Sequence, residues 1–413
     1  MATTNKQTPA LRFPSFTEEW EEKTLGEVCE IKRGKTFSKS DIDEDGTELC
    51  IHYGELLTKY KESITEVYSR TFRTNGLRSK KGDVLMPSSA ETPDALSKAS
   101  ALLLNNVILG SDMNILRTND NTNAVFLSYV INNSEKIITR LVTGGTVFHL
   151  YAKQLNDLAF LLPSLPEQQK IAACLSSLDA LITAAQERLD ALKAHKKGLL
   201  QRLFPREGRK TPELRFAGFK GAWEEKRLGE VANVVRGGSP RPIDEYLTSD
   251  KDGLNWLKIG DISSEAKYIT STSEKVKQSA LKKTRVVSEG ELILSNSMSF
   301  GRPYILKIST CIHDGWIAIK DIKNETFEEF LYYFISSEEI QKYFKSKVAG
   351  GVVKNLKAST IQDLPILFPS LPEQQKIASC LSSLDTLIEV QQERIALLKT
   401  HKKGLLQQLF PNY

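Results

Sequence analysis

The sequence predicts a mixed α/β fold that is used twice in one chain, with the two copies separated by an antiparallel pair of long helices. Three observations support this prediction. Two tails are nearly identical, each tail carries a seven-residue repeat of apolar residues, and the regions before the tails mix short β-type runs with helical stretches. At about 150 residues per domain, the 413 residues are enough for two or three domains.

The tails form the strongest internal repeat. Residues 163–205 and 369–411 are offset by 206 positions, and ten of the 43 positions differ, which leaves 33 identical. A second repeat lies upstream, where residues 8–28 resemble residues 211–231. A period of this length is far too long for a solenoid, so the chain is predicted to hold two copies of one domain-sized unit.

The two bodies between these repeats have diverged, but short anchors keep their order. The first anchor is Tyr53-Gly54-Glu55-Leu56, which matches Ile259-Gly260-Asp261-Ile262, and the second is Gly82-Asp83-Val84-Leu85, which matches Gly290-Glu291-Leu292-Ile293. The third is Gly144-Gly145 with Leu150, Leu155 and Leu158, which matches Gly350-Gly351 with Leu356, Ile361 and Leu364. Shared anchors predict one fold, whereas the differing residues between them predict two specificities.

Each body is predicted to be a mixed α/β domain with several irregular loops. β-type runs cover residues 83–86, 114–117, 291–294 and 316–320, and helical stretches cover 124–139 and 327–347. Clusters of Gly, Ser, Asn and Pro interrupt these segments and indicate turns.

Each tail is predicted to be one long helix with a coiled-coil seam. Apolar residues recur at alternating spacings of four and three, a period of 3.5 residues, and only Lys196 interrupts the seam of the first tail. The seam positions are Ile171, Leu175, Leu178, Ile182, Ala185, Leu189, Leu192, Lys196, Leu199 and Leu203 in the first tail, and Ile377, Leu381, Leu384, Ile388, Gln391, Ile395, Leu398, Lys402, Leu405 and Leu409 in the second.

Local signals mark where these helices begin and end. Ser164 and Glu167, like Ser370 and Glu373, have the spacing of a capping box, with a proline near the first helical position. Pro205 and Pro411 mark the ends. The predicted segments are therefore body 1 at residues 1–163, helix 1 at 164–205, body 2 at 206–369 and helix 2 at 370–413.

Connectivity predicts how the helices pair. Body 2 begins a few residues after helix 1 ends, so helix 2 must run back along helix 1 to pair with it, and Tyr413 is expected near the N-terminus. A helix over residues 167–203 would be about 55 Å long and would hold the bodies at opposite ends. The alternative is that each helix packs separately on its own body.

This geometry suits DNA. A separation of about 50 Å corresponds to roughly 15 base pairs of B-DNA, so two similar bodies related by a twofold axis suit two unlike half-sites on one face. Net charge alone does not predict DNA binding, because the +5 charge is spread along the chain. The geometry by itself does not identify DNA as the ligand.

Local basic clusters supply candidate DNA contacts at matching places in the two bodies. Residues 70–81 and 275–285 are rich in Lys and Arg and precede the Gly-acid anchor of each body, and a second basic loop follows each leader. We expect phosphate contacts from the clusters and base contact from Arg236 or Arg241; the alternative is a solvated basic face. The candidates are Lys32, Arg33, Lys35, Arg70, Arg73, Arg78, Lys80, Lys81, Arg236, Arg241, Lys275, Lys277, Lys282, Lys283 and Arg285.

The sequence carries no pattern for catalysis by this chain alone. It has no phosphate-binding G-x-x-x-x-G-K-[ST] or G-x-G-x-x-G motif, no N-P-P-Y or D-P-P-Y, and no metal-ligand cluster. His195 and His401 lie near helix ends, where cations complement the helix dipole. Asp244 with Glu265 and Lys267 resembles a nuclease set, but body 1 has no counterpart. The five cysteines form no C-x-x-C and suit a reducing cytoplasm.

The repeated PSLPEQQKIA followed by a heptad helix and HKKGLLQ-x-LF, with WEEK-x-LGEV before each body, resembles the specificity subunits of type I restriction-modification systems. The resemblance covers essentially the whole chain. The Gly-Gly-Ser-Pro loop of body 2 also resembles that family, whereas body 1 has Arg33-Gly34-Lys35-Thr36 at that place.

The resemblance implies a function without catalysis. Each body is a target recognition domain that reads half of a bipartite, asymmetric DNA site, and the helices set the gap and dock two methyltransferase subunits. Motor-nuclease subunits join to give restriction. S-adenosylmethionine, ATP and Mg²⁺ are expected only on the partner subunits, and the location is the cytoplasm of a bacterium or archaeon. The alternative from another class is a bivalent protein-binding scaffold with two adaptor heads.

Overall fold

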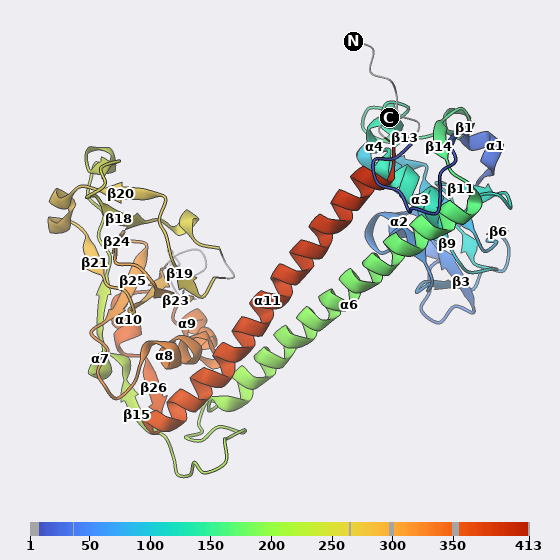
Figure 1. Ribbon diagram of the computed structural model, residues 1–413. Coiled ribbons are helices and arrows are strands. Elements are labelled where there is room, and N and C mark those ends of the chain that lie inside the picture. The colour runs from blue at the N-terminus through green and yellow to red at the C-terminus, as the bar shows by residue number, and fades with distance from the viewer. Residues whose placement is uncertain (1–7, 36, 264–265, 297–300, 349–354, 412–413) are drawn as a thin grey trace. The chain divides into compact units, whose positions relative to one another are not determined.

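The computed structural model describes residues 8–35, 37–263, 266–296, 301–348 and 355–411 (Figure 1). The chain divides into two compact units. The first comprises the residues up to Gln186 and those from Glu393 onward, and the second comprises Glu187–Gln392. The division passes through both long helices, so each unit contains one body, the start of its own helix and the end of the helix that follows the other body.

The first unit contains a five-stranded sheet at its centre. Its order is β2-β11-β7-β9-β4, with every pairing antiparallel except β9 with β4. The strands are β2 (Cys29–Arg33), β4 (Ser63–Ile64), β7 (Asp83–Pro87), β9 (Ser100–Leu102) and β11 (Met113–Thr118). All five residues of β7 are buried, as expected of a central strand rich in apolar residues.

Smaller sheets complete the body of the first unit. A four-stranded sheet has the order β5-β3-β10-β6, a pair joins β1 to β14, and a third sheet has the order β12-β13-β8. The strands are β1 (Glu21–Thr24), β3 (Glu48–Ile51), β5 (Arg70–Thr71), β6 (Leu77–Arg78), β8 (Ser89–Ala90), β10 (Ile108–Leu109), β12 (Thr143–Gly144), β13 (Phe148–His149) and β14 (Ala159–Leu162).

The second unit repeats the central sheet, the four-stranded sheet and the two-stranded pair of the first. Its central sheet has the order β16-β25-β22-β23-β19, and the second sheet has the order β17-β20-β18-β24-β21, which adds β17 to the four-stranded pattern. The strands are β15 (Glu224–Arg227), β16 (Asn233–Arg236), β17 (Leu247–Thr248), β18 (Leu254–Leu257), β19 (Tyr268–Ile269), β20 (Glu274–Val276), β21 (Arg285–Val287), β22 (Leu292–Ser295), β23 (Pro303–Leu306), β24 (Thr310–Ile312), β25 (Trp316–Lys320) and β26 (Pro365–Phe368), which pairs with β15.

Most of the short helices occupy corresponding places in the two bodies, except that η2 lies between β8 and β9 and η5 lies between β20 and β21. The first unit has α1 (Leu25–Val28), η1 (Lys39–Asp41), α2 (Tyr53–Thr58), η2 (Asp94–Ser97), α3 (Ala124–Asn133), α4 (Glu135–Ile138) and α5 (Ala152–Asn156); the second has α7 (Leu228–Val231), η3 (Ile243–Glu245), η4 (Ile259–Asp261), η5 (Gln278–Lys282), α8 (Glu328–Ser336), α9 (Glu338–Val348) and α10 (Ala358–Gln362). The mixed α/β fold predicted for two copies is confirmed.

The predicted strands are close to those observed, but the two predicted body helices are each broken. The stretch 124–139 divides into α3 and α4 at Ser134, and the stretch 327–347 divides into α8 and α9 at Ser337. Ser337 has an extended backbone (φ −63°, ψ 151°), which interrupts the helical hydrogen bonds. Serine competes for backbone hydrogen bonds and favours helix ends, so the break falls at a residue suited to it.

Both tails are single helices, α6 (Leu165–Leu203) and α11 (Leu371–Leu409). The side chains at the predicted seam positions are buried or half-buried, while most other positions of both helices are exposed. In the first unit Leu409 and Phe410 at the end of α11 pack into one core with Ile171 and Leu175 at the start of α6. The end of one helix therefore meets the start of the other.

The second unit shows the same arrangement with the helices exchanged. Leu203 and Phe204, at and just beyond the end of α6, share a core with Ile377 and Leu381 near the start of α11. The two helices are therefore antiparallel in both units, as predicted, and do not pack separately. The backbone N–H of Leu11 donates to Gln408 O at 2.9 Å, so the leader lies against the end of α11; Tyr413 lies outside the described residues.

The repeated carboxylates at the helix starts have a different role from the one their spacing predicted. Both oxygens of Glu167 accept hydrogen bonds from Arg12, each at 2.7 Å, and Glu373 accepts from Arg215 in the same way at 2.7 and 2.8 Å. The buried carboxylates hold the leaders against the long helices, because a bidentate arginine pair fixes both position and orientation. The predicted use of these side chains as caps is thus replaced by a contact distant in sequence.

Candidate nucleic-acid interface and helix junctions

The basic loops that follow β2 and β16 occupy the same position in the two bodies. The backbone N–H of Gly34 donates to Met113 O at 3.0 Å, and that of Gly237 donates to Trp316 O at 2.9 Å. Met113 and Trp316 begin the matching strands β11 and β25. The two loops therefore correspond, although their sequences differ.

Glycine is required at this point because the loop passes very close to a neighbouring turn. A Cβ on Gly34 would lie 1.8 Å from Gly110 O, and a Cβ on Gly237 would lie 2.1 Å from His313 O. Both obstacles are backbone atoms, so a larger residue at either position would displace the loop. This close approach holds the loop backbone against the turn, and it thereby sets the backbone position of the arginines beside the glycine.

One aspartate lies beside the arginines of each loop. In the second unit Arg241 Nη2 is 3.5 Å and Arg236 Nη2 is 3.9 Å from Asp314 Oδ2. In the first unit Arg33 Nη2 is 3.7 Å from Asp112 Oδ1. Asp112 and Asp314 precede the matching strands β11 and β25, so the same pairing occurs in both bodies. Neither aspartate was among the residues predicted from the sequence.

In the second unit the structure brings the loop together with part of the basic cluster. A Cβ on Gly238 would lie 2.6 Å from Lys283 O, so the loop runs directly over this lysine. The Lys277 ammonium donates to Glu245 O at 2.8 Å, and Lys283 lies over the Tyr246 ring at 4.9 Å, which joins both lysines to the segment after the loop. The loop that carries Arg236 and Arg241 therefore adjoins the segment that carries Lys277 and Lys283.

In the first unit, the start of the basic cluster, at and just after β5, likewise contacts the segment that follows the loop. The Arg73 Nε is 2.7 Å from Asp41 Oδ1 in η1, and the backbone N–H of Asp43 donates to Arg70 O at 2.9 Å. The rest of the cluster is elsewhere: Arg78 lies on β6, the opposite edge of the same four-stranded sheet, and Lys80 and Lys81 follow it. At the usual strand spacing these edges are about 14 Å apart.

The two clusters differ in how much of their charge is already neutralised. Arg73 pairs with Asp41 and Arg78 with Glu48, both at 2.7 Å. Among the described residues, no acid pairs with the cluster of the second unit, whose members are Lys275, Lys277, Lys282, Lys283 and Arg285. Lys32 pairs with Glu30 at 3.0 Å, and Lys35 is exposed without an acidic partner in the described part of the chain.

Exposed aromatic side chains stand beside Arg70. Along the segment that contains β5, residues 68, 70 and 72 are exposed while 67, 69 and 71 are buried, so Tyr68, Arg70 and Phe72 share one face. Tyr68 and Phe72 are 62% and 58% exposed, which is unusual for such large side chains. Alternating basic and aromatic residues suit contact with nucleic acid, and the alternation in the sequence could have revealed this face.

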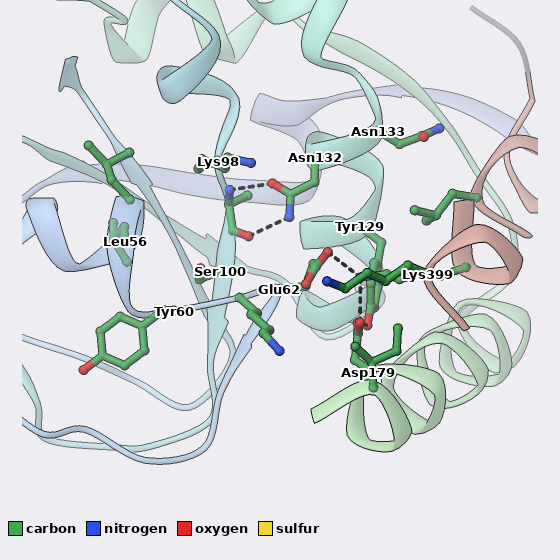
Figure 2. Close-up of a pocket in the computed structure, with 16 residues that line it drawn as sticks. Leu56, Tyr60, Glu62, Lys98, Ser100, Tyr129, Asn132, Asn133, Asp179 and Lys399 are labelled. Atoms are coloured by element: carbon green, nitrogen blue, oxygen red, sulfur yellow. Dashed lines mark hydrogen bonds and ion pairs between the residues drawn. The ribbon is translucent and has the colours of Figure 1, made fainter. Parts of the chain in front are cut away.

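A second set of polar side chains joins the long helices to each body. In the first unit Lys402 of α11 forms ion pairs with Asp179 of α6 at 2.7 Å and with Glu62 of the body at 2.8 Å (Figure 2). The Tyr129 hydroxyl of α3 donates to the other Asp179 oxygen at 2.5 Å. One aspartate thus ties both long helices to the body.

The second unit uses the matching residues. Lys196 of α6 pairs with Asp385 of α11, and the Tyr333 hydroxyl donates to the other Asp385 oxygen. The position of Glu62 is occupied by Lys267, which is buried, pairs with Glu329 at 3.4 Å and donates to the Tyr333 hydroxyl at 2.8 Å. The two junctions therefore share their centre, but the second has Lys267 and Glu329 where the first has Glu62.

These junctions explain the lysines that interrupt the apolar seam. Lys196 and Lys402 stand at corresponding seam positions, and each meets the aspartate of the other helix. A half-buried ion pair of this kind favours one register, because a shifted helix would place the charge against leucine. Removing one partner of a buried pair typically costs about 3–5 kcal/mol, since the other charge is left uncompensated.

The pKa values of the junction groups reflect the same charges. Burial alone lowers the pKa of Lys402, but the hydrogen bonds and charges of Asp179 and Glu62 raise it above its ordinary value. Burial lowers the pKa of Lys267, and Glu329 and Asp385 oppose that effect without cancelling it. Lys402 is therefore held firmly in its charged form, whereas the ammonium of Lys267 is the more costly charge to bury.

In the described part of the chain, the remaining candidate residues do not come together as a catalytic set. Asp244 lies in η3, Lys267 lies in the helix junction, and Glu265 is outside the described residues. Within the described ranges no group of three or more His, Cys, Asp or Glu residues is arranged to hold a metal ion. His195 and His401 are exposed on the long helices, and all five cysteines are free. No described helix has the length and apolar character needed to cross a membrane.

Comparison with known proteins identifies the family. The family model described as "Type I restriction modification DNA specificity domain" matches residues 17–194 and 220–400. The chain belongs to this family. The two matches begin in the two leaders and end in α6 and α11, so each specificity domain comprises one body and most of the helix that follows it. By its family, the chain is a specificity component, and not a catalytic component, of a restriction-modification complex.

Two relatives of this specificity chain from one organism match it over nearly its full length. The putative type I restriction enzyme MjaX specificity subunit of Methanocaldococcus jannaschii is 25% identical over 94% of this chain and 92% of its own length. The type I restriction enzyme MjaVIII specificity subunit of the same organism is 24% identical over 97% and 93%.

Solved structures share the fold. The S subunit of a type I restriction-modification system from M. genitalium aligns with a TM-score of 0.64 at 17% identity, covering 98% of this chain and all of that one. A chain from a structure concerned with complex assembly and conformational transition of the type I system aligns with a TM-score of 0.57 at 19% identity, covering 95% and 98%.

Proposed function

We propose that this specificity subunit selects the DNA sequence for a type I restriction-modification complex by reading a bipartite, asymmetric site, one half with each body. The observation that carries the proposal is that both bodies, which share one topology, place a basic loop with an adjacent aspartate at the same position and place basic residues against the segment that follows this loop. The fold positions the loops alike, while the residues that face outward differ, as two unlike half-sites require.

The arginines of the loops are the proposed base readers, and the other basic residues are the proposed phosphate contacts. Arg236 and Arg241 are 57% and 80% exposed, and a guanidinium can contact two acceptors of guanine at once. Lys277, Lys282 and Lys283, with Arg70, Lys80 and Lys81, are exposed, which suits contact with phosphates. Lys275 is half-buried and donates to Lys251 O. Arg73 and Arg78 are less suited, because Asp41 and Glu48 already neutralise them.

The paired helices are proposed to set the gap between half-sites and to dock two methyltransferase subunits. In this proposal residues 1–163 and 206–369 are the target recognition domains, and residues 164–205 and 370–413 are the spacer helices. Away from the seam, Leu181, Leu387, Val390 and Leu397 are 52%, 48%, 57% and 71% exposed. Such side chains on a helix surface suit contact with another protein.

The catalytic chemistry is assigned to the partners in this proposal. Methyltransferase subunits would bind S-adenosylmethionine and methylate adenine, and motor-nuclease subunits would use ATP and Mg²⁺. The complex would act in the cytoplasm of a bacterium or archaeon, where incoming DNA is met. The chain itself contributes the choice of sequence and the platform for assembly.

Selection from a randomised DNA pool tests the proposed function. The full chain, assembled with its methyltransferase subunits, is mixed with random duplexes, and bound DNA is sequenced after several rounds. We expect two separated blocks of constant sequence with an unspecified gap, and methylated adenines within those blocks in a host that carries the system. Enrichment without two blocks would instead favour the bivalent protein-binding scaffold.

Neutralising the basic clusters should reduce the salt dependence of DNA affinity. Removing a residue that binds one phosphate flattens the slope of log K against log salt by about 0.9. We expect Lys277→Gln with Lys283→Gln to flatten it by nearly two units, and Arg70→Gln by about one. The matched control, Arg73→Gln with Arg78→Gln, removes arginines that are already paired and should change the slope less. Equal slopes in all variants would remove these residues from the interface.

A further inference from the structure

The turn that precedes β25 has a feature that the proposed phosphate and base contacts do not explain. The Asp314 carboxylate lies among exposed basic groups, although an acid at a DNA interface repels phosphate. The Ser239 hydroxyl donates to Asp314 Oδ1 at 2.6 Å, and Arg236 and Arg241 approach the other oxygen. The carboxylate therefore stands at the centre of the loop and not at its edge.

Asp314 holds the loop through its backbone as well. Arg236 Nε donates to Asp314 O at 3.0 Å, and the Asn296 amide donates to the same oxygen at 2.7 Å. The backbone N–H of Gly238 donates to Ile312 O at 3.1 Å. The first part of the loop is thus fastened along the turn, and both arginine side chains lean towards one fixed carboxylate. The Ser239 hydrogen bond and Arg236 keep the pKa of Asp314 below its usual value, so the carboxylate is charged at neutral pH.

We infer that Asp314 and Asp112 are positioning residues for sequence reading, which orient the loop arginines towards base edges and discourage their use on phosphates. A guanidinium held by a carboxylate on one side keeps its remaining N–H groups in a fixed direction, which lowers the entropy lost on bidentate contact with guanine. The carboxylate also opposes phosphate binding by charge. Both effects increase discrimination between sequences and decrease affinity for DNA in general.

The two bodies differ in how many arginines the aspartate orients. Asp314 serves two arginines, which leaves a net positive charge on the set, whereas Asp112 serves Arg33 alone and leaves none. Asp112 has a left-handed backbone (φ 59°), which aspartate tolerates better than most residues. We therefore expect the half-site read by body 2 to contain the stronger arginine-dependent positions.

The test rests on the proposed function and uses the complete complex with Asp314→Asn or Asp112→Asn. Asparagine keeps the size and can accept the Ser239 hydrogen bond, but it removes the charge. For Asp314→Asn we expect one constant block to lose about tenfold in discrimination at one or more positions, the usual scale of one arginine-base contact. Affinity for a random duplex should rise several-fold. Asp112→Asn should affect the other block, and less strongly.

Two controls separate positioning from loss of structure. Asp363→Asn removes an exposed acid that pairs with Arg227 at 3.2 Å, so it changes net charge equally while leaving the loop alone, and it should leave both blocks unchanged. A collapsed loop would lower affinity for every DNA, whereas loss of positioning raises the affinity for random DNA. The inference would be overturned if Asp314→Asn left both blocks unchanged, or if it lowered the affinity for the selected site and for random DNA alike. A wild-type complex that selects no pair of blocks would overturn the proposed function as well.

Discussion

Replacing residues 212–368 with residues 9–162 of the same chain should convert the asymmetric DNA site into a symmetric one. The first half-site should remain as it was, and the second should become a copy of it in the opposite orientation. Since each mismatched base pair typically costs about 1–3 kcal/mol, DNA that carries the original second half should bind at least about a hundredfold more weakly.

The structure indicates that this exchange preserves the helix junction. The transplanted body brings Arg12 to the place of Arg215 and Tyr129 to that of Tyr333, so the hydrogen bonds to α6 and α11 have matching donors. Trp20 likewise takes the place of the buried Trp223. Glu62 would replace Lys267 beside Lys196, which repeats the ion pair that Glu62 makes with Lys402. The charge at the junction thus remains compatible.

Sequencing of selected duplexes and mapping of methylated adenines would measure the outcome. The reciprocal exchange, in which residues 212–368 replace residues 9–162, is the control and should give the other symmetric site. A chimaera that alters both half-sites, or that retains the original second half, would contradict separate reading by the two bodies. Thermal unfolding would establish that both chimaeras fold.

Lengthening both long helices by one heptad should widen the gap between half-sites without altering either sequence. Seven helical residues add about 10 Å, which corresponds to roughly three base pairs. The two insertions belong between Gln186 and Glu187 and between Gln392 and Glu393, where the chain divides into its compact units. Each unit then keeps its own internal packing, including both seam lysines with their aspartates.

Selection from a pool with variable gaps would measure this change. Three base pairs turn the second half-site by about 100° around the DNA axis, so we also expect weaker binding. A heptad placed in α6 alone, within residues 178–192, is the control. In this variant α11 is seven residues shorter than α6. Since each unit contains an end of both helices, the two helices can no longer keep both sets of contacts, and the variant should unfold at a lower temperature. An unchanged gap in the doubly lengthened chain would refute the ruler function.

The contrast between the seam and the junction shows what local pattern can predict. The heptads of residues 171–203 and 377–409 predicted both helices, because a 3.5-residue period is read directly along the chain, and the connectivity predicted their antiparallel course. Lys196 and Lys402 appeared as interruptions of that pattern. Their partners could not be predicted, since Lys402 and Glu62 are 340 residues apart and no local period connects them.

The loops show the same contrast between what local pattern predicts and what it does not. Their glycines and arginines indicated an exposed basic segment, but Asp314 lies 78 residues from Arg236 and 75 from Ser239 in sequence. The strand order brings them together, and that order depends on which buried faces pack best. Similarly, Glu167 had the spacing of a cap, but Arg12 from the leader occupies its carboxylate.

By itself, therefore, the sequence determined the duplication, the mixed α/β character of each copy, the two long helices and their opposed directions. These features follow from repeats, periodicity and connectivity, which can be read along the chain without knowing its tertiary contacts. Only the tertiary structure decided the strand order, the junctions that join helix ends to bodies, and the aspartates that hold the arginines. Those contacts depend on distant segments meeting in a packed core, where shape and charge must both be satisfied.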